Sequence, residues 1–326
     1  MNYSNLFRKE VFVKPSAFKL SHKDKILLLG SCFTANISSF LNNFGFGVSY
    51  PFGTLYNPIT IGNNLQRILR KNHFNETDVV ENNDRFYSWN HSSNYSGDNK
   101  KEFVRSINEE MTSLNSSLKE SSTIIITLGT SFVYKHINYG LVGNCHKLPS
   151  RDFVKRMLSL EEMLHCWTDV LSSLENKNII FTVSPVRHWS DGAIDNTRSK
   201  SQLHLLISKL EAEFDNTAYF PSYELMMDEL RDYRFYKKDM LHPSHQAVEF
   251  IWDKFVNCYF NTSTKAVLAE VTAIRKSLSH KPFNPKSKNH QQFLKKCLQQ
   301  IKTIQKKTPH YYWDKESSTI KDQLDD

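Results

Sequence analysis

The sequence predicts a three-layer α/β/α fold whose centre is a doubly wound, mainly parallel sheet. Three short apolar runs support this prediction, because each has the length and composition of a strand buried on both faces: Lys25–Leu29, Thr123–Leu128 and Asn178–Val183. Glycine or serine ends each run, and segments with helical periodicity lie between the runs. Strands that alternate with helices at this spacing form parallel sheets covered on both faces.

In the first half of the chain, helical spacing follows the first strand at Ile37, Phe40 and Leu41. Gly45 and Gly47 then mark a turn into a second strand. Before the next buried run we expect a loop at 51–54, a helix over 59–69, a surface insertion with short strands around 73–100 and a helix over 103–118.

The second half continues the alternation with a hairpin over 132–148, a helix near 160–174, a loop over 184–196, a helix over 199–213 and a short strand at 218–220. Pro243 is expected to open the last helix of the body. The body, residues 1–260, is then one domain. The tail, 261–326, is expected to form two helices around a break at Pro282 and Pro285, followed by disorder.

The composition is that of an ordinary globular chain, with 39% hydrophobic and 23% charged residues among 326. The five cysteines are scattered and form no CxxC pair, which favours neither a disulfide framework nor a cysteine-based zinc site. No apolar stretch approaches the roughly 20 residues needed to span a bilayer. The N-terminal segment has no secretory pattern, so we expect a cytoplasmic protein.

The net charge of +8 lies almost entirely in the tail. Residues 261–326 hold 13 lysines and arginines against 6 acidic residues, whereas the body is nearly neutral. This distribution favours a solvated helical appendage over a nucleic-acid surface; association of the basic tail with nucleic acid is the less favoured alternative.

Chemistry is expected where the first strand ends, at Gly30 and Ser31. Ser31 begins a helical pattern, and the free N–H groups of a helix N-terminus stabilise developing negative charge. A serine nucleophile needs a base, and His242 is the best candidate, with Asp239 to orient its ring. Because Pro243 biases His242 toward an extended conformation, both side chains can point to the same place.

Donors for an oxyanion are expected close to this serine. The backbone N–H of Ser31 or Cys32 is one choice, and Gly53 and Gly129 are others, because glycine lets a substrate approach the backbone. Asn144 is a further candidate through its side-chain amide.

Four cations follow the strand at 178–183: Arg187, His188, Arg198 and Lys200. A cationic segment at the end of a strand can hold an anionic or hydroxylated acyl acceptor. Aromatic residues of the insertion, together with Trp189, are candidates for stacking on sugar rings.

Gly30-Ser31-Cys32-Phe33 resembles the signature of the GSCFA family, which belongs to the SGNH (GDSL-like) hydrolase superfamily; Thr34 replaces the final Ala of the signature. Further segments resemble the same family in the same order: Pro51–Pro58, Thr127–Thr130, Gly143–Lys147, Ser184–His188 and Asp239–Pro243. The ordered blocks make the resemblance specific.

The resemblance implies an SGNH or flavodoxin-like fold and a serine-dependent esterase or O-acyltransferase. Its substrate would be an acyl ester, such as that of a carbohydrate or another small hydroxylated molecule, and no metal or cofactor is required. The resemblance gives the nucleophile's role to Ser31, the orienting acid to Asp239, the base to His242 and an oxyanion donor to Gly53. Ser131 replaces the asparagine of the usual Gly-x-Asn block.

Three other interpretations stay open. Cys32 is a possible nucleophile, because a helix N-terminus lowers a thiol's pKa. Asp239, His242 and His245 are possible metal ligands. The missing asparagine also fits a catalytically silent ligand-binding domain.

Overall fold

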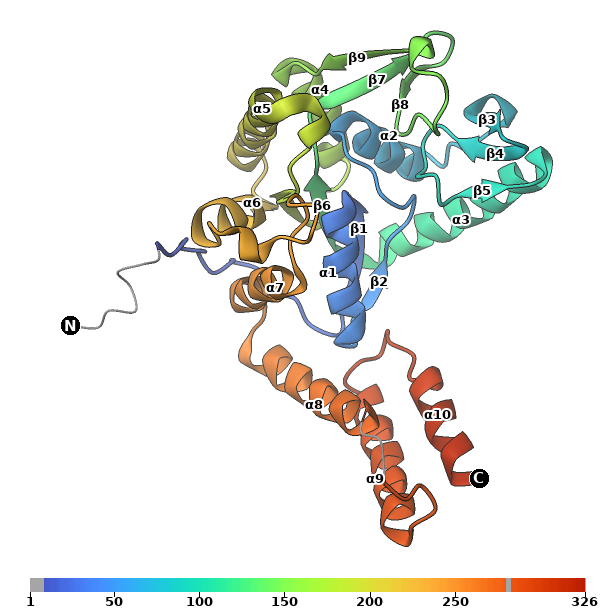
Figure 1. Cartoon of the computed structure of the whole chain (residues 1–326), viewed down its shortest axis with the longest axis vertical. Helices are drawn as coiled ribbons and strands as arrows, with labels where there is room; N and C mark the ends of the chain where they lie inside the picture. The colour runs from blue at the N-terminus through green and yellow to red at the C-terminus, as the bar shows by residue number, and fades with distance from the viewer. Residues whose placement is uncertain (1–8, 280–282, 326) are drawn as a thin grey trace.

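A computed structural model describes residues 9–279 and 283–325, and a five-stranded parallel sheet forms its centre (Figure 1). The strands lie in the order β11 (Thr217–Tyr219), β10 (Asn178–Val183), β6 (Ser121–Leu128), β1 (Lys25–Gly30) and β2 (Gly47–Ser49). The predicted α/β class is therefore confirmed. In a sheet with this order, ligands bind outside the carboxyl ends of the strands where the winding reverses, which here is between β1 and β6.

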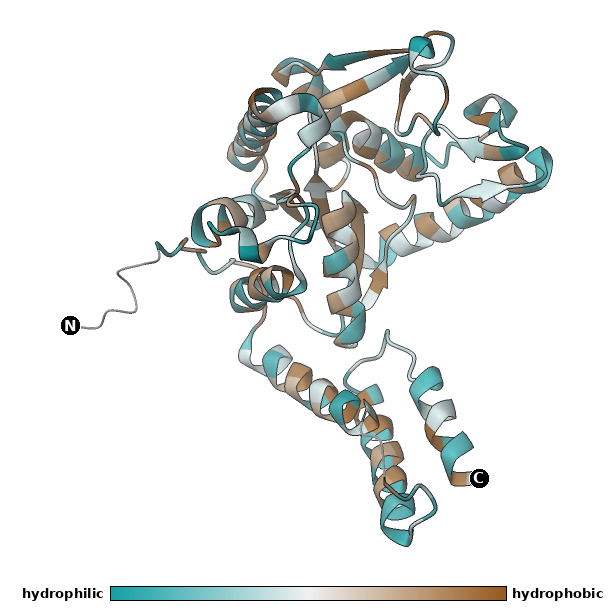
Figure 2. Ribbon diagram, in the orientation of Figure 1, coloured by the Kyte–Doolittle hydropathy of each residue, from teal (hydrophilic) through white to brown (hydrophobic). Residues whose placement is uncertain are grey.

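Helices cover both faces of the sheet. One face packs against α1 (Cys32–Asn43) and α7 (His245–Tyr259), and the other against α2 (Pro58–Leu69), α3 (Lys100–Glu120), α4 (Leu160–Ser172) and α5 (Gly192–Glu213). Alternate residues of β1 serve the two cores: Leu27 and Leu29 point to one, and Ile26 and Leu28 to the other. The strands are accordingly apolar along their length (Figure 2).

Two small antiparallel sheets extend from the body. One contains β3 (Val79–Asn82), β4 (Arg85–Ser88) and β5 (Ser96–Gly97), the short strands expected in the insertion. The other contains β8 (Gly140–Val142), β7 (Phe132–His136) and β9 (Phe153–Met157). The hairpin of β7 and β8 was expected, but β9 was not, because its residues show no clear alternation and its pairing with β7 is what fixes it.

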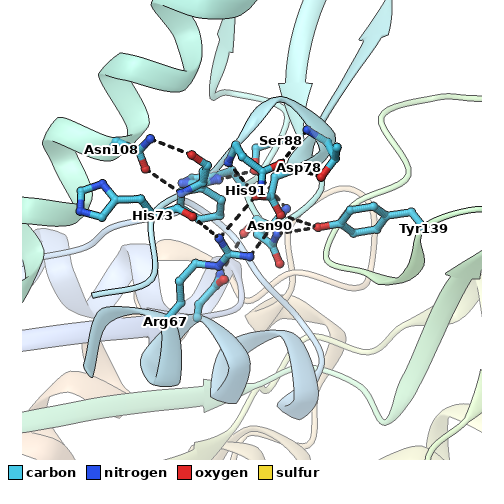
Figure 3. Close-up of polar contacts among 12 residues, drawn as sticks. Arg67, His73, Asp78, Ser88, Asn90, His91, Asn108 and Tyr139 are labelled. Atoms are coloured by element: carbon cyan, nitrogen blue, oxygen red, sulfur yellow. Dashed lines mark hydrogen bonds and ion pairs between the residues drawn. The ribbon is translucent and has the colours of Figure 1, made fainter. Parts of the chain in front are cut away.

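A buried polar cluster fastens the insertion to the body (Figure 3). Asp78 accepts hydrogen bonds from Arg67 of α2 at 3.1 Å and from the hydroxyl of Tyr139 at 2.8 Å. His91 is 1% exposed, and its Nδ1 lies 2.8 Å from the hydroxyl of Ser88. The two small sheets are thus linked to each other and to α2.

Two segment boundaries differ most from expectation, and two short helical elements were not expected. The loop after β10 is shorter than predicted, because α5 begins at Gly192. The last body helix begins at His245 rather than Pro243, since the Ser244 hydroxyl caps it by accepting from the N–H of Ala247. A three-residue helix, α6 (Ser222–Glu224), and a π-helical turn (Leu225–Glu229) follow β11.

The tail forms three helices: α8 (Thr262–Ser279), α9 (Lys288–Gln305) and α10 (Asp314–Asp325). The disorder expected after the second helix is wrong, because Trp313 and Ile320 bury themselves in a separate core with α8 and α9. Pro285 lies between α8 and α9, as expected, and Pro282 lies outside the described residues. Within the described part of the chain, no helix has the length and apolarity needed to cross a membrane.

The tail packs where the strands begin. His310 contacts the start of β2 at Gly47 and lies 3.1 Å from the carbonyl of Lys23, just before β1. We call this end of the sheet the amino edge, and the opposite end, where Gly30, Gly129 and Ser184 lie, the carboxyl edge. Figure 1 shows the tail extending away from the body.

Candidate active site

The turn from β1 into α1 forms the centre of the carboxyl edge. Gly30 has φ of 133°, a conformation that favours glycine, and a Cβ at this position would overlap the carbonyl of Thr127 on β6. Ser31 follows in an extended conformation, and its N–H donates to the carbonyl of Thr127 at 3.1 Å. The chain therefore leaves β1 in close contact with β6 and enters α1 directly.

Ser31 and Cys32 differ in their exposure. Ser31 is 1% exposed, and its Oγ accepts a hydrogen bond from the N–H of Phe33 at 3.3 Å, which makes it the N-cap of α1. Cys32 is only half-buried. Burial raises the pKa of the Cys32 thiol, while the nearby ammonium of Lys200, the N–H groups of the helix start and the ammonium of Lys237 oppose that rise.

Asp239 and His242 form the hydrogen-bonded pair that their spacing predicted. The Nδ1 atom of His242 lies 2.7 Å from Asp239 Oδ2. The other oxygen, Oδ1, accepts the N–H groups of Leu241 and His242, each at 2.9 Å. These N–H groups, with the imidazole, lower the pKa of Asp239 to about 2. The carboxylate therefore favours the tautomer with a proton on Nδ1, which leaves Nε2 available as a base.

The backbone around this pair is held by its own hydrogen bonds. Lys237 donates its N–H to the carbonyl of His242 at 2.8 Å, and Met240 adopts a left-handed conformation with φ of 58°. His242 then leads into α7, which packs beside α1. Among the described residues, no hydrogen bond joins Ser31 to His242.

Lys200 is a buried cation at the carboxyl edge. Its Nζ donates to the carbonyls of Gly129 at 2.7 Å and Ser184 at 2.8 Å, so it bridges the ends of β6 and β10. The pKa of Lys200 is lowered to about 7, mainly by burial; Cys32 opposes this shift, and the neighbouring guanidinium of Arg187 adds to it. In its protonated form, Lys200 contributes positive potential beside Cys32.

Some of the predicted oxyanion donors already have hydrogen-bond acceptors in the protein, and others do not. The N–H of Gly129 donates to the carbonyl of Tyr56 at 2.7 Å, and that of Ser31 is bound to Thr127, so neither is free for a ligand. The N–H of Cys32 is the first of α1 and has no intrahelical acceptor. Thr54 forms a β-bridge with Gly30, which brings the neighbouring Gly53 close to the end of β1. Within the described residues, the N–H of Gly53 has no hydrogen-bond partner.

The two side chains that were expected to replace the missing asparagine have other hydrogen-bond partners. Ser131 is fully buried, and both its N–H and its hydroxyl donate to Ser199 Oγ, at 2.8 and 3.2 Å. Asn144 instead faces the insertion, where its Oδ1 accepts from the Ser93 hydroxyl and from the N–H of His146.

A cavity of about 610 Å³ opens beside Asp239. We call it the Arg187 cavity; its lining residues are Arg187, Trp189, Met227, Arg231, Asp232, Tyr233, Tyr236, Asp239, Met240 and Leu241. Arg187, predicted as a substrate-side cation, thus shares a cavity with the predicted acid. His188 lies outside this lining: its Nδ1 is 3.3 Å from Asp191, and its ring is near that of Tyr56.

The sequence analysis did not predict the burial of Lys200, or the contact of Ser199 with Ser131. Lys200 was expected among the cations that follow β10 and contact a substrate, but it is buried on α5, whereas Arg198 is exposed and pairs with Asp195. The sequence contained a signal, because Lys200 has helical spacing with Leu203 and Ile207 and so belongs to the apolar face of its helix.

Metal chemistry was one of the open interpretations. Over the described ranges, no group of three or more His, Cys, Asp or Glu side chains is arranged to hold a metal ion. His245, one of the proposed ligands, is 3.2 Å from Glu249 on its own helix.

Comparison with known families covers most of the sequence. The GSCFA family matches residues 25–255, and the C-terminal domain of GSCFA domain proteins matches residues 271–326. The first match contains every segment on which the resemblance was based. No curated protein matches the chain.

Proposed function

Because the chain belongs to the GSCFA family, we propose that it is an SGNH-type acyl-transfer enzyme, either an esterase or an O-acyltransferase. The observation that supports this most is the Asp239–His242 pair, whose 2.7 Å hydrogen bond leaves the second imidazole nitrogen available. An imidazole oriented by a carboxylate is the usual base for a hydroxyl or thiol nucleophile. The pair precedes α7, and the turn with both candidate nucleophiles precedes the neighbouring α1.

The geometry favours Cys32 over the predicted Ser31 as the attacking group. The Ser31 hydroxyl is buried and caps the helix, whereas Cys32 is only half-buried and lies near Lys200 and Lys237. Since burial raises the thiol's pKa, its deprotonation requires a base, and His242 is the group we assign to that step. In this proposal Ser31 has a structural role, as the cap of α1.

The proposed reaction has two halves. Nε2 of His242 takes the proton of the Cys32 thiol while sulfur attacks the ester carbonyl, and the N–H groups of Cys32 and Gly53 stabilise the oxyanion. The C–O bond of the ester breaks, and the leaving alkoxide takes the proton from His242. Water or a second hydroxyl then attacks the thioester, again losing its proton to His242, and the thiol is regenerated.

Matched variants test this assignment. With 4-nitrophenyl acetate and butyrate, Cys32→Ala and His242→Ala are each expected to lower kcat/KM by ~100-fold or more. Ser31→Ala is expected to reduce activity far less and to cost about 1 kcal/mol of stability as a lost cap. Denaturation by urea separates the two effects.

Trapping the intermediate identifies the nucleophile directly. An acetyl group on Cys32 is a thioester, which neutral hydroxylamine removes, whereas an acetyl group on Ser31 resists it. Loss of activity in Ser31→Ala with retention in Cys32→Ala would return the role to Ser31. Absence of turnover by the unmodified protein on several acyl esters would favour the catalytically silent ligand-binding domain.

A further inference from the structure

We propose that the Arg187 cavity binds an anionic group of the substrate, a carboxylate or a phosphate, and that Arg187 is the residue that recognises it. The link from this cavity to acyl transfer rests on the proposed function, because Asp239 lines the cavity. Binding of the anion itself rests on the geometry alone.

Within the part of the chain that the structure describes, Arg187 is a cation without a counter-ion. Its Nε is buried and has no hydrogen-bond partner, and among the described residues no carboxylate pairs with its guanidinium. Its guanidinium carbon lies over the ring of Trp189, 4.9 Å from the ring centre. A planar guanidinium presents paired donors that match a carboxylate or phosphate.

The two acids that line the cavity are already engaged. Both oxygens of Asp239 bind within its own loop, to Leu241 and His242. Asp232 accepts the N–H of Arg234 at 2.9 Å and lies 3.4 Å from the Arg234 guanidinium. Arg187 is therefore left for a ligand, because the cavity's own carboxylates are committed to other donors.

The surrounding charges favour an anion as well. Arg187 lies near the buried ammonium of Lys200, whose pKa it lowers, and Arg231 lines the same cavity. When Lys200 is protonated, its charge and that of Arg187 repel each other, and a bound anion relieves that repulsion.

The remaining walls indicate what the anion is attached to. Tyr233 and Met240 are 73% and 50% exposed, and Tyr236 and Met227 lie beside them. Exposed aromatic and thioether side chains provide an apolar, adaptable surface. The ligand is thus an ester whose apolar or aromatic part ends in an oxyanion.

Binding is measured with unreactive amides, so that the result does not depend on turnover. The probes are 4-acetamidobenzoate, 4-acetamidophenyl phosphate and neutral 4-acetamidobenzamide, titrated calorimetrically into the full chain. At least one anion is expected to bind about tenfold or more tightly than the neutral probe. The preferred anion identifies a carboxylate or a phosphate ligand.

Variants of Arg187 assign the effect. Arg187→Met is expected to remove the preference for the anion and to leave binding of the neutral probe unchanged, whereas Arg187→Lys retains part of it. Arg198→Gln, an exposed residue of α5 outside the cavity, is the matched control and retains the preference. Thermal unfolding of each variant verifies that it is folded.

Equal binding of charged and neutral probes would overturn the proposal, as would a preference that survives in Arg187→Met or no binding of the anions at millimolar concentration. The matching esters, such as 4-acetoxybenzoate and its methyl ester, test the link to catalysis. Selective binding of the anions without ester turnover would support the anion site and reject acyl transfer. Turnover of the esters without a preference for the anions would support acyl transfer and reject the anion site.

Discussion

Lys200 shows how one buried residue can organise a site. Its ammonium replaces water at two strand-end carbonyls that would otherwise be left without donors inside the protein. The same cation adds positive potential beside the half-buried Cys32. Its role is therefore both structural and electrostatic.

The bridging role of Lys200 can be tested by replacing its side chain. Lys200→Met keeps the volume but leaves the carbonyls of Gly129 and Ser184 buried without a donor, at ~1–3 kcal/mol for each unsatisfied group. Urea denaturation is expected to show that loss. The control is Lys209→Met, an exposed residue of the same helix, with little change expected. Equal stability of the two variants would contradict the bridging role.

His91 gives a prediction about pH. Burial, reinforced by the charges of Arg67 and His146, lowers the pKa of His91 to about 3. The unfolded chain protonates this histidine below about pH 6.5 whereas the folded chain does not, so stability is lost as pH falls from that value toward 3. The histidine contributes at most ~1.4 kcal/mol per pH unit to this loss.

The measurement compares urea denaturation at pH 7 and pH 5 for the unmodified chain and for His91→Gln. A smaller pH dependence is expected in the variant, because glutamine does not titrate. An equal change in unfolding free energy between pH 7 and pH 5 in both proteins would mean that His91 does not titrate as described.

The residues of the site were predictable where chemistry fixes a local spacing. Asp239 and His242 are three positions apart on one loop, and their hydrogen bond follows from that spacing and from Pro243. The exposure of Ser31 and Cys32 was not predictable, because it depends on how α1 leaves the sheet. Gly129 was identified as a strand-end residue, but only the fold reveals that Tyr56 occupies its N–H.

At the scale of elements, the close contact of β1 with β6 depends on Gly30. An alanine there would have both an unfavourable φ and a clash with the Thr127 carbonyl. Gly140 also has a positive φ, of 109°, but open space surrounds the position of its absent Cβ. A comparison of alanine substitutions at the two glycines therefore distinguishes the cost of backbone strain from the cost of a steric clash.

We expect Gly140→Ala to cost only the strain of the left-handed backbone, ~1–3 kcal/mol. Gly30→Ala is expected to cost more and to abolish the proposed esterase activity, because the β1–α1 turn must move away from β6. Denaturant unfolding and ester hydrolysis measure the two effects. Comparable losses of stability in both variants would show that the contact with Thr127 is not limiting.

The fold was largely predictable because its central strands are buried on both faces. Such strands appear as uninterrupted apolar runs, and the runs at 25–29, 123–128 and 178–183 became adjacent strands. The elements that were missed depend on contacts between distant residues. β9 is fixed by its pairing with β7, and α10 by the burial of Trp313 against the other tail helices.

At the scale of the whole molecule, the tail and the candidate site lie at opposite ends of the sheet. His310 and Tyr312 lie near Lys25 and Ser121, the first residues of β1 and β6. The site lies at the far ends of the same strands. Most buried apolar side chains of the tail form a core of their own, whereas Leu268 of α8 packs with one of the two cores of the body.

This separation predicts that the tail can be weakened without affecting catalysis. Trp313→Ala removes a side chain that is 1% exposed and is expected to destabilise the tail by ~3–5 kcal/mol. Hydrogen exchange in α9 and α10 would rise, while kcat/KM for an ester stays within about twofold. Tyr312→Ala, at a side chain that is 77% exposed, is the control. A large fall in kcat/KM would show that the tail and the site are coupled.

The five tryptophans are distributed so that one differs from the rest. Trp89, Trp167, Trp252 and Trp313 are each less than 5% exposed, whereas Trp189 is 49% exposed and stacks on Arg187. A dissolved quencher such as iodide or acrylamide would therefore reach mainly the indole at the mouth of the cavity. Intrinsic fluorescence then offers an optical signal for ligand entry, without any added dye.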